Sequence, residues 1–162
     1  MKHRKLRKVI EVIFFVLIPL IVGSIGSLFS KSSLKTWYTS LVKPFFNPPN
    51  WIFGPVWTFL YILMGVSAYI VCSKGWKKTK VKIALGVFFF QLLLNMAWSI
   101  LFFGLQSPLL AFIEIILLWG AILATIILFY RVSKTAAYLL LPYILWVSFA
   151  VVLNFSLLIL NL

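Results

Sequence analysis

Five long apolar stretches dominate this chain of 162 residues. Each is long enough to cross a bilayer core of roughly 30 Å as a helix, which takes about 20 apolar residues. The stretches cover residues 9–29, 52–73, 83–105, 109–130 and 136–160. Three of the four connections between them are too short to fold as domains. The sequence therefore predicts an all-α membrane protein, in which residues 1–162 form one domain built as a five-helix transmembrane bundle.

The composition excludes the soluble alternatives. Hydrophobic residues make up 64% of the chain and charged residues 10%, and the mean hydropathy is +1.12. Neither a soluble globular fold nor a disordered chain has so little polar surface. A single cysteine, Cys72, excludes an internal disulfide, and the one histidine, His3, lies in a charged leader. We therefore expect no metal site and no required cofactor.

The basic residues follow the pattern of membrane topology. Fifteen Lys and Arg residues oppose two acids, for a formal charge of +13. In a soluble protein this balance would indicate nucleic acid, which we do not expect here because the cations flank apolar runs. Twelve of the fifteen fall in the leader or in residues 74–82 and 131–135. The positive-inside rule then predicts a multi-pass protein of the bacterial cell membrane, with a cytoplasmic N-terminus and an external C-terminus.

The first stretch has a second interpretation. A basic leader, an apolar run and the small residues 23–27 are also typical of a cleavable signal peptide. The length of the run, with Glu11 and Pro19 inside it, favours an uncleaved helix. The following residues 30–51 are rich in Pro, Asn, Ser and aromatic residues, and they are the one connection long enough to carry structure. We expect this segment to form an ordered cap over one end of the bundle.

Three of the predicted helices carry aromatic and amide residues at helical spacing. These stripes are Trp57, Tyr61, Met64 and Ala68; Gln91, Asn95, Trp98 and Phe102; and Tyr143, Trp146, Ala150 and Asn154. If they face a common interior, they line a flat-walled cavity suited to a large planar apolar ligand. The alternative is ordinary packing, since amides in spans often hydrogen-bond neighbouring helices for about 1 kcal/mol or less.

Glu114 is the residue of the predicted membrane spans whose burial in lipid costs the most free energy. A carboxylate at the bilayer centre costs about 2.5–3.5 kcal/mol even on lenient scales. We expect it to be neutral or hydrogen-bonded, with Asn95, Trp98 or a hydroxyl as partner, and to act as a structural clamp more readily than as a proton relay. Gly120 and Ala124 stand four residues apart, a spacing that allows close approach of helices within the bundle or across a dimer.

The order of several short motifs resembles the TspO/MBR family, which includes tryptophan-rich sensory proteins and the animal translocator protein or peripheral-type benzodiazepine receptor. The resemblance runs from about Leu34 to Asn154. Its main motifs are Trp37-Tyr38, Phe53-Gly54-Pro55-Val56-Trp57, Gln91 with Asn95 and Trp98-Ser99, Glu114-Ile115, Leu141-Pro142-Tyr143, Trp146, and Phe149-Ala150 with Leu153-Asn154.

This resemblance implies a five-helix bundle, commonly a homodimer, whose first long loop covers a cavity for tetrapyrroles such as protoporphyrin IX. Together with Trp98 from the stripes, the matching positions give a predicted ligand site. They are Tyr38, Pro48, Phe53, Trp57, Tyr61, Gln91, Asn95, Trp98, Trp146, Phe149, Ala150 and Leu153. Trp57 and Trp146 resemble the tryptophans linked to light-dependent porphyrin breakdown. The sterol motif of animal members is absent after Leu153, so a sterol role is unsupported.

Three functions remain open on the sequence. The first is binding and sensing of a tetrapyrrole, iron-free in preference to haem because no His or Cys is available at the cavity. The second is a light-dependent porphyrin-degrading activity that uses Trp57 and Trp146 as oxidisable groups. The third is transport of a tetrapyrrole or another small apolar ligand through the membrane.

Overall fold

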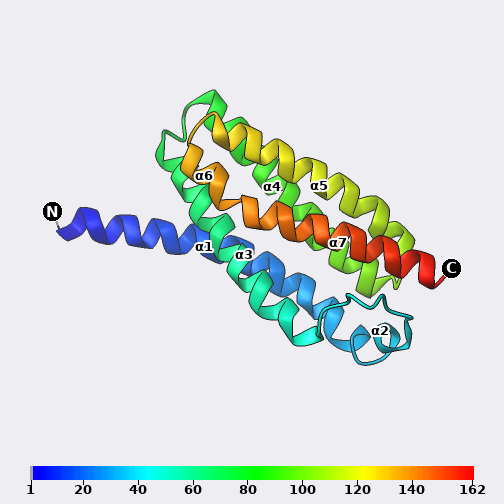
Figure 1. Cartoon of the computed structure of the whole chain (residues 1–162). Coiled ribbons are helices and arrows are strands. Elements are labelled where there is room, and N and C mark those ends of the chain that lie inside the picture. The colour runs from blue at the N-terminus through cyan, green and yellow to red at the C-terminus, as the bar shows by residue number, and fades with distance from the viewer. Residues whose placement is uncertain (1) are drawn as a thin grey trace.

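The computed structural model describes residues 2–162, with side chains from Lys5 onward, and the described chain is helical without strands. The elements are arranged as a bundle of long helices with one short helix at its edge (Figure 1). They are α1 (Lys2–Ser33), α2 (Trp37–Ser40), α3 (Asn50–Ser73), α4 (Thr79–Ser99), the π-helical turn η1 (Ile100–Gly104), α5 (Pro108–Tyr130), α6 (Lys134–Leu139) and α7 (Leu141–Leu160).

Five helical segments are long and apolar enough to cross a membrane, which confirms the predicted architecture. They are Lys5–Ser33, Asn50–Ser73, Thr79–Gly104, Pro108–Tyr130 and Lys134–Leu160. The first exceeds the predicted 9–29 at both ends, because Lys and Arg are good helix formers and extend the helix beyond its apolar run. The last is divided at Leu140, just before Pro142, whose missing N–H and bulky ring interrupt a helix.

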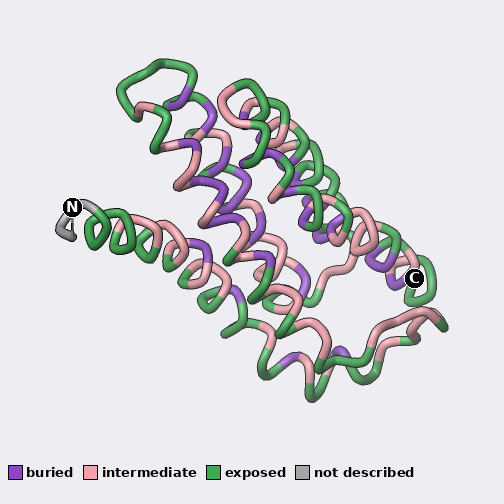
Figure 2. Tube along the Cα trace, turned by 60° about the vertical axis from the view of Figure 1, so that its left-hand side comes forward, coloured by how far each residue is buried: buried purple, intermediate pink, exposed green. Residues whose placement is uncertain are grey.

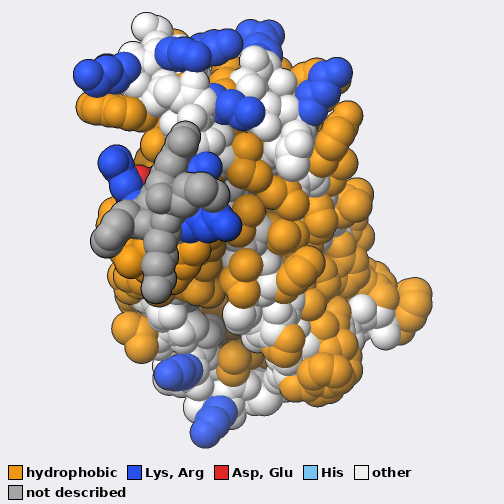
Figure 3. All heavy atoms as spheres, turned by 90° about the vertical axis from the view of Figure 1, so that its left-hand side faces the viewer, with side chains coloured by type: hydrophobic (Ala, Val, Ile, Leu, Met, Phe, Trp, Pro, Cys, Tyr) orange, Lys and Arg blue, Asp and Glu red, His pale blue; other side chains and the backbone are white. Residues whose placement is uncertain are grey.

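The helices pack in an order that places the chain ends apart. α4 packs on α5, α5 on α7, and α1 on both α3 and α4. The N-terminal part of α1 extends away from the bundle and is mostly exposed, whereas the buried residues concentrate inside the bundle, on α3, α4, α5 and α7 (Figure 2). Lys and Arg gather at the end that holds the α3–α4 connection, and few lie at the opposite end (Figure 3).

Two glycines allow α1 to approach α3 closely. A Cβ atom on Gly65 would overlap the Cα atom of Val16 and lie 2.7 Å from the Phe15 carbonyl oxygen, so the backbones are in contact there. A Cβ atom on Gly23 would overlap a ring carbon of Tyr61, so this ring lies directly against the α1 backbone. The two helices therefore cross tightly at these points, as small residues permit in membranes.

The cap predicted for residues 30–51 is ordered, with narrower bounds: α1 runs to Ser33 and α3 begins at Asn50. The Tyr38 hydroxyl donates to Asn47 Oδ1 at 2.9 Å. Burial raises the pKa of Tyr38, which keeps this hydroxyl protonated as a donor at neutral pH. The backbone N–H of Val42 donates to Asn161 Oδ1, and Asn161 Nδ2 donates to the Val42 carbonyl, each at 2.9 Å. These bonds fasten the cap to the end of α7.

Candidate ligand cavity

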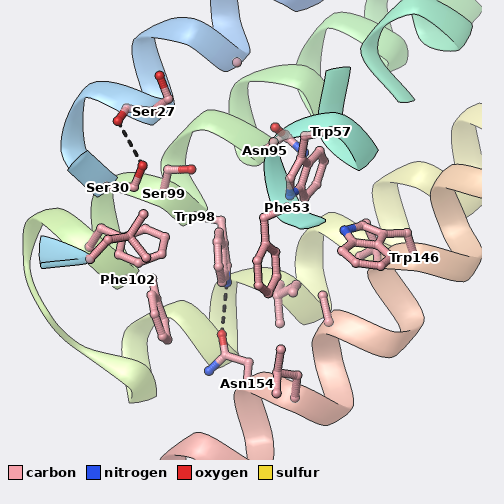
Figure 4. A pocket seen from close by; sticks show the side chains of 18 of the residues that line it. Ser27, Ser30, Phe53, Trp57, Asn95, Trp98, Ser99, Phe102, Trp146 and Asn154 are labelled. Carbon is pink, nitrogen blue, oxygen red and sulfur yellow. Dashed lines mark hydrogen bonds between the residues drawn. The ribbon is translucent and has the colours of Figure 1, made fainter. Parts of the chain in front are cut away.

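A cavity of about 540 Å³ lies under the cap, between α1, α3, α4 and α7. This volume falls within the range of about 300–1,000 Å³ that is typical of small-molecule sites. α5 contributes Ile115 and Leu118 to the wall, and the cap contributes Leu34 and Tyr38. The side chains that line it converge from different helices onto one space (Figure 4).

Aromatic rings form most of the α3 wall, and α4, η1 and α7 add further rings. The rings of Trp57 and Tyr61, one turn apart on α3, are stacked at 5.5 Å between centroids. Phe53, one turn before Trp57, meets Trp146 of α7 edge to face at 6.0 Å. Trp98 of α4 stacks on Phe102 of η1, with 5.0 Å between the ring centroids and an angle of 12° between the rings. The walls therefore offer flat apolar faces, as a planar ligand requires.

A chain of hydrogen bonds connects α3, α4 and α7 beside the aromatic wall. Tyr61 donates to Asn95 Oδ1 at 2.7 Å, and Asn95 Nδ2 donates to the Tyr143 hydroxyl at 3.0 Å. The Tyr143 hydroxyl in turn donates to Gln91 Oε1 at 2.8 Å. Asn95 keeps one N–H and one oxygen lone pair for a further partner. Asn95 therefore links three helices, and only its remaining N–H group and oxygen lone pair are available to a ligand.

A second pair of bonds fixes Trp98. Its indole Nε1 donates to Asn154 Oδ1 at 3.0 Å, and Asn154 Nδ2 donates to the carbonyl of Pro108 at 3.0 Å. The orientation of the Trp98 ring is therefore set by α7 and by the first turn of α5. By contrast, the indole N–H groups of Trp57 and Trp146 donate to no acceptor among the described residues, although both side chains line the cavity. Each is a hydrogen-bond donor without a protein partner.

Nine of the twelve predicted site residues lie on the cavity wall. They are Tyr38, Phe53, Trp57, Tyr61, Asn95, Trp98, Trp146, Ala150 and Leu153. The other three lie behind it. Gln91 is buried and accepts from Tyr143, Phe149 packs against Trp146 at 5.5 Å, and the Pro48 carbonyl accepts from Asn47. Their roles in ligand binding remain predictions, and the structure offers these three an indirect role through the wall residues.

The wall that α1 provides was not predicted from the sequence. Ser24, Ser27 and Ser30 line the cavity at intervals of three residues, together with Leu20 and Gly23. In the sequence this segment resembled the cleavage region of a signal peptide. The spacing of its serines, three residues apart, could have predicted a polar face of the first helix that points toward a cavity. In Figure 4, Ser27 and Ser30 lie on one side of the space and Trp146 on the other.

For two residues, Glu114 and Gly120, the structure rules out one of the two alternatives that the sequence left open. Both carboxyl oxygens of Glu114 are buried and have no hydrogen-bond partner among the described residues, so the clamp through Asn95 or Trp98 does not exist. Those two side chains are engaged by Tyr61, Tyr143 and Asn154 instead. Gly120 is exposed, and a Cβ atom added there would have no atom within 4 Å, so it mediates no close approach within the bundle. A neutral Glu114 and a dimer contact at Gly120 remain predictions.

Five spanning helices around an internal aromatic cavity define a multi-pass α-helical membrane protein with room for a small molecule. Residues 15–160 match the model of the TspO/MBR family, and the chain belongs to this family. It is 51% identical over 142 residues to the tryptophan-rich protein TspO of Chlorobaculum tepidum, covering 88% of this chain and 90% of that protein.

Relatives occur well beyond bacteria. The tryptophan-rich protein TspO of Archaeoglobus fulgidus is 47% identical over 154 residues, covering 94% of this chain and 98% of that protein. The human translocator protein is 39% identical over 142 residues, covering 87% of this chain and 84% of its own length. The resemblance predicted from the motifs is therefore confirmed along most of the chain.

Proposed function

We propose that this protein binds and senses a tetrapyrrole, with protoporphyrin IX as the representative ligand, in the cavity under the cap. The observation that carries the proposal is the convergence of Trp57, Trp98 and Trp146 from three helices onto one space of about 540 Å³. Flat aromatic faces favour a flat conjugated ligand, because rings gain by stacking beyond the area that they bury. Family membership supports this ligand class and does not select one compound.

The cavity favours an iron-free porphyrin over haem. Haem iron takes axial ligands such as His, Cys, Met or Tyr. The cavity lining contains no His, Cys or Met, and the described residues hold no cluster of three His, Cys, Asp or Glu side chains. The two phenols that line the cavity, Tyr61 and Tyr38, already donate their hydroxyl hydrogens to Asn95 and Asn47. The indole N–H groups of Trp57 and Trp146 are free to donate to a ligand acceptor.

The combined substitution of Trp57 and Trp146 by alanine should weaken protoporphyrin IX binding by about a hundredfold. Each truncation removes one face of the stack, at a cost of about 1–1.5 kcal/mol beyond lost area, and 1.4 kcal/mol corresponds to a factor of ten in affinity. Equilibrium titration of the full-length protein in nanodiscs measures this change. The readout is the porphyrin absorption band, because the substitutions themselves remove tryptophan fluorescence.

The matched control replaces two tryptophans that lie outside the cavity. Trp76 is 61% exposed in the α3–α4 connection, and Trp119 donates to Ser148 on the outer face of α5. Trp76→Ala with Trp119→Ala should leave the affinity within about threefold, because neither side chain faces the ligand space. Equal affinities of the wild type and the Trp57, Trp146 variant would contradict the proposal.

A light-dependent porphyrin-degrading activity is the second candidate function. Two indole rings without protein acceptors face the proposed ligand space, and the described residues offer no acid–base pair there. Indole is an oxidisable electron donor, so a photoexcited porphyrin in contact with Trp57 or Trp146 can take an electron from it and form a radical pair. Molecular oxygen is the co-reactant: it adds to the porphyrin radical anion, the electron returns to the indole radical cation, and both oxygen atoms remain as carbonyl groups in the opened macrocycle. Transport is the alternative that a cavity alone also permits, and uptake of protoporphyrin IX by sealed proteoliposomes distinguishes it.

The charge pattern supports a cytoplasmic position for the basic end of the bundle. In a Cys72→Ala background, a membrane-impermeant maleimide should label Lys77→Cys in inverted vesicles and leave it unlabelled in intact spheroplasts. Lys35→Cys, in the cap at the opposite end, should show the reverse. Both lysines are exposed, so reagent access depends on the side of the membrane alone. The opposite labelling pattern would invert the topology predicted from the positive-inside rule.

A further inference from the structure

The exposed part of the cavity wall is confined to two helices. Four lining residues of α3 and two of α1 are exposed, whereas every lining residue of the cap, α4, η1, α5 and α7 is buried or half-buried. The exposed ones are Ser24, Ser27, Asn50, Trp51, Gly54 and Thr58. The cavity therefore has a mouth, and this mouth lies between the second half of α1 and the first half of α3.

The mouth is bounded at both ends. On the side of the cap, Leu34 is half-buried and Tyr38 is 3% exposed, so the cap covers this end of the cavity, while Asn50 and Trp51 leave the first turn of α3 exposed beside it. On the other side, α1 and α3 come together where Gly23 lies against the Tyr61 ring and Gly65 lies against the Val16 backbone. The opening between these two closures is a slit between helices, and its long axis follows α1.

The mouth runs from the first turn of α3, at Asn50 and Trp51, down to the depth of the lipid chains. Ser24 is nine residues before the end of α1, and Thr58 is eight residues after the start of α3, which places them about 12–14 Å from these helix ends at 1.5 Å per residue. Half of a bilayer core is about 15 Å thick. Beside the mouth, the α1 residues Ile21 and Ile25 are 56% and 42% exposed, as lipid-facing side chains are.

The rim of the mouth is lined with hydroxyl groups that bond to their own helices. Ser24 donates to the Leu20 carbonyl and Ser27 to the Ser24 carbonyl, each at 2.7 Å, and Thr58 donates to the Gly54 carbonyl at 2.9 Å. Each hydroxyl hydrogen is thus engaged, while oxygen lone pairs remain as acceptors. The rim tolerates hydrocarbon and can also accept an O–H or N–H group of a passing molecule.

We propose that the cavity exchanges its ligand with the hydrocarbon layer of the membrane, through the mouth between α1 and α3. The ligand is then a flat amphiphile that is dissolved in the bilayer before it binds. For the identity of that molecule the proposal rests on the tetrapyrrole function proposed above. The position of the mouth rests on the structure alone, so the two are tested separately.

Nitroxide labels measure which phase fills the mouth, with no ligand present. Gly54→Cys, in a Cys72→Ala background, carries the label at the rim, where no atom lies within 4 Å of an added Cβ. Gly86→Cys, equally open and exposed on α4, is the lipid control, and Lys35→Cys in the cap is the water control. The full-length protein is reconstituted in liposomes, and collisions with oxygen and with a water-soluble nickel chelate are measured by power saturation.

We expect the Gly54 label to match the Gly86 label, with frequent oxygen collisions and several times fewer nickel collisions than the Lys35 label. Nickel collisions at Gly54 equal to those at Lys35 would show a mouth open to water and overturn the proposal. The result holds whether or not a porphyrin binds, so it separates failure of the mouth from failure of the ligand assignment.

Plugging the mouth gives the kinetic test. Gly54→Phe adds a ring at the rim, where an added Cβ has no atom within 4 Å, and Gly86→Phe and Gly120→Phe are matched controls at equally open positions away from it. Protoporphyrin IX is supplied in donor liposomes, and tryptophan quenching is followed by stopped flow. Gly54→Phe should slow both binding and release about tenfold, because a ring in the mouth raises the barrier that the ligand crosses in either direction. Rates equal to those of the controls would overturn the proposal. Absence of binding to the wild type would refute the tetrapyrrole assignment instead.

Discussion

Alanine at Gly65 should destabilise the protein by about 3 kcal/mol or more, at the upper end of the range for overpacked cores. The added methyl group would overlap Val16 Cα and lie 2.7 Å from the Phe15 carbonyl oxygen and 2.8 Å from Val16 N. All three are backbone atoms, so no side chain can rotate away and α1 must separate from α3. Thermal unfolding in detergent should show a transition lower by roughly 6–12 °C, at about 2–4 °C per kcal/mol for a chain of this size.

The control for this substitution is Gly86→Ala on α4. Gly86 is exposed and has no atom within 4 Å of an added Cβ, so the methyl group enters open space. Its expected effect is a gain of up to about 1 kcal/mol, from the better helix propensity of alanine. Equal unfolding temperatures for the two variants would mean that α1 and α3 do not touch at Gly65, and that the helices cross more loosely below the cavity.

Helix length and position could be predicted from the sequence because the bilayer imposes them. Apolar runs of about 20 residues are read from composition alone, and each of the five became a helix. The ends were less predictable. The first helix extends into its basic leader, and the cap is shorter than expected because both flanking helices extend into it. A helix end depends on capping and packing contacts that an apolar run does not encode.

Helical spacing identified the right faces and could not tell how deep along each face the cavity extends. On α3, Trp57 and Tyr61 line the cavity, while Met64, one turn further on, is completely buried in the core. The reason is the crossing at Gly65, where α1 closes against α3 and ends the open space. The position of that crossing depends on two helices together, and the pattern of one helix holds no information about it.

For the polar residues of the membrane spans, the sequence likewise predicted which way a side chain faces and did not predict its hydrogen-bond partners. The spacing indicated that Asn95 faces the interior, which it does, but its bonds to Tyr61 and Tyr143 depend on the rotation of three helices. For Glu114 the energetic argument allowed either a neutral group or a hydrogen-bond partner, and the structure provides no partner among the described residues. The cost of a buried charge predicts that the group is neutral or paired, and it does not choose between the two.

The second large effect is expected in light. The wild-type protein with bound protoporphyrin IX should lose porphyrin absorbance under illumination in air, whereas Trp57→Phe with Trp146→Phe should lose it no faster than porphyrin in empty nanodiscs. Phenylalanine keeps an aromatic ring at both positions, so binding should stay within about tenfold of the wild type. Benzene rings are far harder to oxidise than indole, so the electron donor is removed while the wall remains.

Three comparisons decide whether the two indoles carry this reaction. Dark samples of both proteins should keep their porphyrin, which separates photochemistry from passive binding. Trp76→Phe with Trp119→Phe changes as many tryptophans outside the cavity and should decay at the wild-type rate, because neither side chain lines the ligand space. If the Trp57, Trp146 variant also decayed at that rate with its porphyrin bound, neither indole would be the electron donor. The cavity would then act on its ligand by binding alone.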